Sequence, residues 1–218
     1  YSDAMDELGT FSTKHNIPVT QTVMGYSTMK KDHSHFLGPI GGLGGKAANN
    51  FAKKTDLAIA IGTKLADFTT GSWANFENPN FSLININVAR FDANKHMAQS
   101  VIGDAKVSLT ELSQALGDWK APDDWYKKSR DELKSWNEYI DKESGPTNQE
   151  LPSYAHAVGA IYRNSDPTDI AVTAAGGLVG EVVQVWRPKE LNTHETEWGF
   201  SCMSYEISGA LGCLLYTS

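Results

Sequence analysis

Apolar and polar positions along the first half of this chain alternate between helical and extended spacing. Apolar residues recur on one side of Asp3–His15, and Lys46–Lys54 and Val107–Leu116 have the same helical pattern. Four segments have the apolar pattern of strands: Ile17–Val23, Asp56–Gly62, Phe81–Val88 and Ser100–Asp104. The run Asp56–Gly62 is typical of a strand buried on both faces. This alternation predicts an α/β fold with a Rossmann-like parallel sheet covered by helices. The intervening stretch Gly25–Gly45 is rich in Gly and His and is predicted to be a loop.

The pattern changes after Gly117. Pro122–Glu143 is dense in Asp, Lys, Glu and Trp, which indicates a charged surface helix or helical linker that ends at the breaker Gly145–Asn148. Three further elements form a second α/β unit: a helix over Ser153–Arg163, a buried strand over Asp169–Ala175 and a helix over Leu178–Trp186. We therefore predict a central domain over residues 1–117, a charged helical linker over 118–148 and the start of a second α/β domain over 149–218.

Composition excludes several classes of protein. Hydrophobic residues make up 40% of the 218 positions, with six Trp, eight Tyr and eight Phe, which is enough for a packed core. The net charge of −7 without a basic run disfavours nucleic acid or an anionic membrane as a partner. No signal peptide or membrane-length apolar run is visible. Cys202 and Cys213 lack metal-ligand spacing and fit a reducing compartment, so we expect a cytoplasmic protein.

The end of the chain has an unusual helix pattern. Trp198–Gly212 predicts a tight loop that leads into a helix with one face of small residues: Ser204, Ser208, Gly209 and Gly212. Such a bare face lets another backbone or a cofactor approach closely. Because the chain begins at Tyr1 without Met and stops soon after this helix begins, we expect it to be an internal piece of a longer protein.

Two glycine-rich turns are candidate phosphate sites. Gly42–Ala47 matches the G-x-G-x-x-A dinucleotide pattern, with Asp67 at the spacing of a ribose-binding carboxylate. Pro39 and Gly41 interrupt any strand leading into this pattern, so we interpret it as a turned loop that opens a helix. The strand Asp169–Ala175 followed by Gly176-Gly177 and a helix predicts either a phosphate site or an ordinary tight turn, and the sequence leaves both open.

Two other features have a structural and a functional interpretation. His33 and His35 are spaced as a metal-binding pair, but no third ligand is near in sequence, which favours surface or substrate-facing groups. Met203 lies in the loop before the small-faced helix, where it is either core filler or a wedge under a cofactor ring.

Several segments, spread over nearly the whole chain, resemble one known family: Ile17–Gly25, Gly38–Gly41, Ala58–Trp73, Ile86–His96, Thr173–Leu178 and Ser201–Ile207. Together they are similar to the thiamine diphosphate enzymes related to acetolactate synthase. Asp67–Trp73 and Asn87–Asp92 are the more specific segments. They resemble the members that hydrolyse a C–C bond of a cyclic trihydroxy-dione in inositol breakdown, giving 5-deoxyglucuronate. An acetolactate synthase-like carboligase or decarboxylase, or a non-catalytic nucleotide-binding module, remain alternatives.

The resemblance implies an architecture and a set of partners. Family members have a pyrimidine-binding domain, a central Rossmann-like domain that binds FAD in some relatives, and a diphosphate-binding domain. Residues 1–117 correspond to most of the central domain. The residues from about Gln149 onward correspond to the opening of the diphosphate-binding domain. The resemblance further implies thiamine diphosphate and Mg²⁺ as cofactors, a small-molecule substrate, and a homo-oligomer, a dimer or tetramer, with active sites between subunits.

The resemblance also assigns roles to individual residues. Met203 would hold the cofactor bent, so that its 4′-amino group lies next to thiazolium C2. The other expected cofactor-binding residues are Gly176, Gly177 and Leu178 beside the diphosphate, and Ser201, Cys202 and Tyr205 around the same pocket. His33, His35 and Asp67 are candidates for substrate contact.

The chain departs from the family in three respects. The Gly-Asp-Gly…Asn signature that holds Mg²⁺ is expected downstream of Ser218, and the Glu that activates the cofactor lies on a domain outside this sequence. The resemblance therefore assigns no metal ligand and no catalytic residue here, and we expect this chain to be inactive alone. Ser204 replaces a Gly that is usual in the family, which is expected to crowd the loop. Cys213–Ser218 does not continue the family pattern, so we expect this tail not to belong to the fold.

Overall fold

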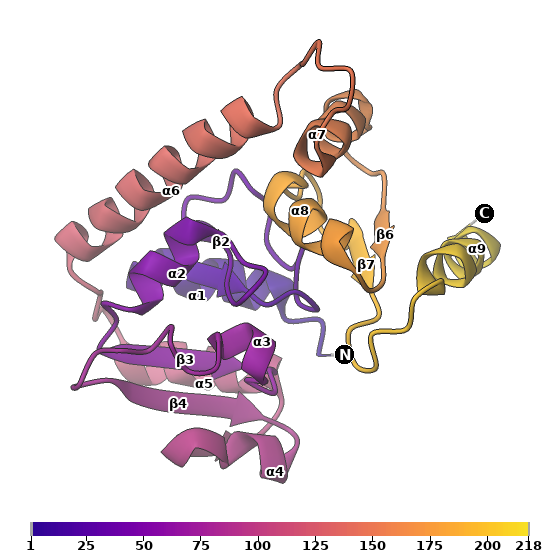
Figure 1. Cartoon of the computed structure of the whole chain (residues 1–218). Coiled ribbons are helices and arrows are strands. Elements are labelled where there is room, and N and C mark those ends of the chain that lie inside the picture. The colour runs from indigo at the N-terminus through magenta and orange to yellow at the C-terminus, as the bar shows by residue number, and fades with distance from the viewer. Residues whose placement is uncertain (1, 218) are drawn as a thin grey trace.

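Every strand pair among the described residues is parallel, and Figure 1 shows the strands with the helices around them. The computed structural model describes residues 2–217. The strands of this part of the chain form three sheets: β1 (Val19–Gln21) with β2 (Phe36–Pro39); β3 (Leu57–Ile61), β4 (Ser82–Asn87) and β5 (Gln99–Ile102); β6 (Ala171–Thr173) with β7 (His194–Thr196). Helices connect and cover these strands, which confirms the α/β class.

The helices of seven residues or more lie close to where the periodicity places them. Their bounds are α1 (Met5–His15), α2 (Lys46–Ala52), α3 (Asp67–Thr70), α4 (Arg90–Ala93), α5 (Ala105–Leu116), α6 (Asp123–Glu143), α7 (Tyr154–Asn164), α8 (Gly177–Val185) and α9 (Tyr205–Thr217), with a 3-10 turn at Lys95–Met97. Local capping fixes two of the starts. The Asp104 carboxylate accepts hydrogen bonds from the amides of Lys106 and Val107 ahead of α5, and Ser153 forms a capping box with His156 at α7.

The strands differ more from expectation. β2 lies within Gly25–Gly45, which the sequence predicts to be a loop. The strand was not predicted because its four residues include the breakers Gly38 and Pro39. β7 and the short helices α3 and α4 were not predicted at all. The expectation of full burial was wrong for two strands: Leu57 of β3 is 47% exposed, and Ile170 beside β6 is 41% exposed. β3 is an edge strand of its sheet, and β6 pairs only with β7 in the described part of the chain.

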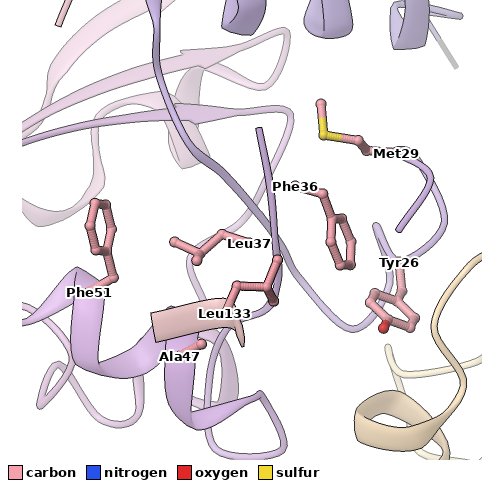
Figure 2. Close-up of a cluster of buried hydrophobic side chains, with 7 residues drawn as sticks. All are labelled: Tyr26, Met29, Phe36, Leu37, Ala47, Phe51 and Leu133. Atoms are coloured by element: carbon pink, nitrogen blue, oxygen red, sulfur yellow. The ribbon is translucent and has the colours of Figure 1, made fainter. Parts of the chain in front are cut away.

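The largest buried cluster lies between the first sheet and α6 (Figure 2). Its members are Tyr26, Met29, Phe36, Leu37, Ala47, Phe51 and Leu133. Leu133 comes from α6, so the charged helix contributes an apolar side chain to the core of the first part of the chain, the elements from α1 to α5.

The same helix also packs against the second part of the chain, the elements from α7 to α9. Ile140, two turns beyond Leu133, is buried with Val158 of α7 and with Val182 and Val185 of α8. Trp136 packs against both clusters from its place between Leu133 and Ile140. The segment predicted as a linker therefore forms a helix that belongs to two cores at once.

A third cluster joins the two parts directly. Val23, just after β1, is buried with Val179 and Val183 of α8, and Leu43 and Trp198 pack against them. No helix among residues 2–217 is both long enough and apolar enough to cross a lipid bilayer.

Candidate functional site

The register of β6 and β7 brings two distant candidate segments to one edge. Ala171 lies opposite His194, and Thr173 opposite Thr196. Because parallel strands end at the same edge of a sheet, the segments that follow them begin there together. After β6 comes Gly176-Gly177-Leu178, and after β7 comes the loop that contains Met203. α9 packs against both strands (Figure 1).

The turn after β6 has an open backbone. Gly176 adopts φ 115° and ψ −177°, a conformation essentially restricted to glycine, and a Cβ at this position would meet nothing within 4 Å. No acceptor among the described residues receives the amide hydrogens of Gly176 and Gly177. These amides open α8, where the positive end of the helix dipole favours an anion. The side chain of Leu178 is 48% exposed beside them.

The loop after β7 is ordered by one carboxylate. Glu197 Oε1 accepts a hydrogen bond from the Phe200 amide at 2.7 Å, and Oε2 accepts one from the Cys202 amide at 2.8 Å. These backbone hydrogen bonds, that from Cys202 first, lower the pKa of Glu197. Glu197 was not predicted, because no sequence motif links a carboxylate to amides that follow it within a few residues.

The loop is also anchored to the first part of the chain. Trp198 meets the Phe68 ring of α3 edge-on, with the ring centroids 5.3 Å apart. Beyond this anchor, Met203 is 78% exposed at the end of the loop, directly before α9. This exposed apolar side chain, in the loop that begins at the same strand edge as the Gly176-Gly177 turn, is available for contact with a ligand or another segment of protein.

Two serines of this loop have left-handed backbones. Ser201 has φ 52° and Ser204 has φ 75°, a region where a residue with a Cβ is strained and glycine is not. Ser204, where the resemblance led us to expect a crowded loop, thus has a strained backbone conformation. Tyr205 begins α9, and its hydroxyl donates to Glu195 of β7 at 3.2 Å.

The small-residue face of α9 is only partly used. Gly209 lies against β6, where a Cβ would be 3.3 Å from Val172 and 2.9 Å from the Tyr205 ring. Ser208 is exposed, and a Cβ on Gly212 would meet nothing within 4 Å. We expected Cys213–Ser218 not to belong to the fold, but α9 continues through Thr217; Ser218 lies outside the described residues.

The first glycine turn is closed on itself. The amides of Gly42, Gly44 and Gly45 donate to the carbonyls of Phe68, Gly41 and Pro39, respectively, at 2.6 to 2.9 Å. A Cβ on Gly44 would lie 2.5 Å from the backbone of Ile40. β2 does lead into this turn, contrary to our expectation. The amides of the turn nevertheless face carbonyls of the chain, and the helix α2 that follows has only seven residues.

The three candidate substrate residues lie in two places. His35 is buried, its ring nitrogens are hydrogen-bonded to Ser34 and Asn16, and burial lowers its pKa to about 4. The ring of His33 lies 6.0 Å from that of His35, and burial lowers its pKa also. Asp67 begins α3 directly before Phe68, one residue from the anchor of the Trp198 loop. The structure thus brings Asp67 near the loop after β7. His35 instead contacts Asn16, directly after α1, Tyr126 of α6 and Ser34 of its own loop.

Among residues 2–217, no group of three or more His, Cys, Asp or Glu side chains is placed to hold a metal ion.

A family model and several known proteins are similar to this chain. Residues 1–112 match the family model of the thiamine pyrophosphate enzyme central domain. Curated relatives named 3D-(3,5/4)-trihydroxycyclohexane-1,2-dione hydrolase align with 99% of this chain: one from Bacillus anthracis at 34% identity, one from Geobacillus thermodenitrificans at 35% and one from Clostridium tetani at 37%. The chain spans 37% of the length of each of these relatives.

Proposed function

Because the chain belongs to the thiamine pyrophosphate enzyme family, we propose that it is part of a thiamine diphosphate-dependent hydrolase. The proposed reaction opens the ring of 3D-(3,5/4)-trihydroxycyclohexane-1,2-dione by cleavage of a C–C bond, giving 5-deoxyglucuronate in inositol breakdown. The names of the relatives support this substrate, since they align with nearly the whole chain.

One observation carries the proposal within this chain. The open Gly176-Gly177 turn and the loop ending at Met203 begin at the same edge of the β6–β7 pair. Free amides at the start of α8 fit a diphosphate, and the exposed Met203 fits the face of an aromatic ring system.

The residues of the chain have distinct tasks in this proposal. The amides of Gly176 and Gly177 bind the diphosphate, and Leu178 covers one side of it. Met203 sets the conformation of the ring system, and Ser201, Cys202 and Tyr205 line the surrounding pocket. Glu197 acts indirectly, because its hydrogen bonds to the Phe200 and Cys202 amides hold the loop in one shape.

Thiamine diphosphate, when bound, supplies a carbon nucleophile and an electron sink for cleavage next to a carbonyl. We further propose that Mg²⁺ accompanies the diphosphate, that its ligands and the activating Glu come from outside this chain, and that the protein acts as a cytoplasmic dimer or tetramer. The central domain over residues 1–117, the linker over 118–148 and the diphosphate-binding domain from 149 onward complete the proposal. His33, His35 and Asp67 remain candidates for substrate contact.

The test uses a full-length enzyme that contains this sequence. We expect it to open the dione ring with thiamine diphosphate and Mg²⁺, and to leave pyruvate unchanged. Met203→Ala is expected to lower kcat about 100-fold, since a misplaced cofactor loses its orientation. Met24→Ala, at a methionine that is 61% exposed outside the site, is the matched control. Carboligation of pyruvate would favour the acetolactate synthase-like alternative, and unchanged kcat in Met203→Ala would refute the assigned role.

The 218-residue chain gives a second test. We expect no turnover from it with thiamine diphosphate and Mg²⁺. Measurable ring opening by this chain alone would contradict the proposal that essential groups lie elsewhere.

A further inference from the structure

A cleft of about 500 Å³ lies between the loop before β2, α6, α7 and the segment after α8. Its lining includes four cationic side chains and a single carboxylate: Lys31, Arg163, Arg187, Lys189 and Asp141. The chain as a whole has a net charge of −7, so this is a local concentration of the opposite sign. A cleft of this size accommodates a small molecule.

Arg187 lines this cleft and has one unsatisfied buried donor. One of its terminal nitrogens pairs with Asp141, and its guanidinium lies 5.7 Å from the centre of the Tyr162 ring. Its Nε is buried and has no hydrogen-bond partner among the described residues. A buried donor without an acceptor is unfavourable, so this guanidinium has hydrogen-bonding capacity that the described residues do not use.

The other cations differ in how firmly they are held. Lys189 Nζ donates to the Tyr162 carbonyl at 3.1 Å and the Ser165 carbonyl at 2.7 Å, which fixes its charge in place. Arg163 donates one hydrogen bond to the Ser144 carbonyl. The Lys31 side chain is exposed and has no ion-pair partner in the part of the chain that the structure describes. Its backbone is tied to the far wall, because its amide donates to the Pro188 carbonyl at 2.8 Å.

We propose that this cleft binds the phosphate group of a small phosphorylated metabolite, through Lys31, Arg163 and Arg187. A phosphate ester has close to two negative charges at neutral pH, and its oxygens accept hydrogen bonds from several directions. Arginine forks match phosphate oxygens, and a mobile lysine adds a point charge. None of these residues belongs to the segments around Gly176 or Met203, so the proposal does not depend on the proposed function.

Isothermal titration calorimetry of the 218-residue chain tests this, with inorganic phosphate, glycerol 3-phosphate and acetate at constant ionic strength. We expect saturable binding of both phosphates, with glycerol 3-phosphate at least as tight as inorganic phosphate and acetate weaker. Acetate binding as tightly as the phosphates, or an absence of saturable heat, would overturn the proposal.

Two substitutions with opposite signs sharpen the test. Lys31→Gln is expected to weaken phosphate binding by about threefold to tenfold, because one charge-assisted contact is lost. Asp141→Asn is expected to tighten binding by a similar factor, because the only carboxylate of the lining becomes neutral and Arg187 is released. Lys127→Gln removes a charge from an exposed lysine on α6 outside the lining and is the matched control.

Damage to folding alone cannot produce tighter binding in Asp141→Asn. Equal losses in Lys31→Gln and Lys127→Gln would show attraction by overall charge only and would overturn the site. Weaker binding in Asp141→Asn, measured on protein with an unchanged circular dichroism spectrum, would overturn it also. If Asp141→Asn does not fold, the comparison of Lys31→Gln with Lys127→Gln decides alone.

Discussion

The turn after β2 and the turn after β6 both place glycines between a parallel strand and a helix. In the first, the amides of Gly42, Gly44 and Gly45 are bonded to carbonyls of the chain. In the second, those of Gly176 and Gly177 have no acceptor among the described residues. The similar sequence pattern therefore gives a closed structural turn in one place and an anion-compatible turn in the other.

The difference comes from residues outside the pattern. The Phe68 carbonyl reaches the first turn from α3, and the Asn49 side chain both accepts from the Gly41 amide and donates to its carbonyl, at 2.9 Å each. Among the described residues, a Cβ on Gly176 would meet no such neighbour within 4 Å. Whether a glycine turn can receive a phosphate thus depends on what the rest of the fold places against it.

Gly41 and Gly176 form a matched pair for testing this difference, because both have φ 115°. In Gly41→Ala the new Cβ would overlap the Phe68 carbonyl, in addition to the strain of the positive φ. We expect the free energy of unfolding to fall by about 4 kcal/mol, measured by urea denaturation. A loss no larger than that in Gly176→Ala would contradict the closed first turn.

The pH dependence of stability compares the two regions, because each contains a buried histidine. Burial lowers the pKa of His35 in the first part and of His194 in β7 to about 4. The unfolded chain, with histidine pKa near 6.5, binds more protons between these values, so stability falls as pH is lowered from about 6.5 toward 4.

We expect a loss of about 1.5 kcal/mol per histidine between pH 6.5 and pH 5, or about 3 kcal/mol for both. His194→Gln and His35→Gln should each remove about 1.5 kcal/mol of this pH dependence in urea denaturation at the two pH values. A pH dependence that is unchanged in both variants would contradict burial of the neutral rings.

Gly176→Ala is expected to cost less than Gly41→Ala, about 1.5 kcal/mol, because strain is present without a clash. In the full-length enzyme the same substitution should weaken the binding of thiamine diphosphate, measured by calorimetry, because the turn changes shape. Gly62→Ala, at a glycine that has φ 64° with equally open surroundings, controls for strain outside the site. Equal effects of both variants on cofactor affinity would count against the role of the second turn.

Ser204→Gly should give the smallest effect, with the opposite sign. Removal of the Cβ relieves the strain at φ 75°, so we expect stabilisation by about 0.5–1 kcal/mol in thermal unfolding. Ser208→Gly, at an exposed helical position of α9, should destabilise by a comparable amount. Destabilisation by Ser204→Gly would show that its hydroxyl makes a contact worth more than the strain.

The sequence predicted the helices better than the strands for a physical reason. Helices such as α6 extend over many residues, so their period is visible, whereas β2 and β7 have four and three residues. Tertiary pairing with a parallel neighbour, and not local propensity, makes such short segments extended. The pattern in Phe36–Pro39 contains two breakers and still forms a strand paired with Val19–Gln21.

The candidate site was predictable only as far as local pattern reaches. The glycines at 176 and 177 were recognised from sequence because strand, turn and helix follow one another there. Met203 was recognised from its place before the small-faced helix and from the family resemblance. Glu197 and the Phe68–Trp198 contact were not, since each depends on a partner that the fold brings in. The roles of the predicted site residues stay predictions until the variants above are measured.

The two cores that share α6 limit where this molecule can be divided. A cut anywhere between Leu133 and Ile140 would leave an apolar patch on each product, so neither piece would be expected to remain stable in isolation. Relative rotation of the two parts would meet the same obstacle, because a rigid helix anchored at both ends transmits a movement of one part to the other. Cleavage sites, inserted tags and flexible spacers are better tolerated after Glu143, in the exposed segment around Pro146–Gln149.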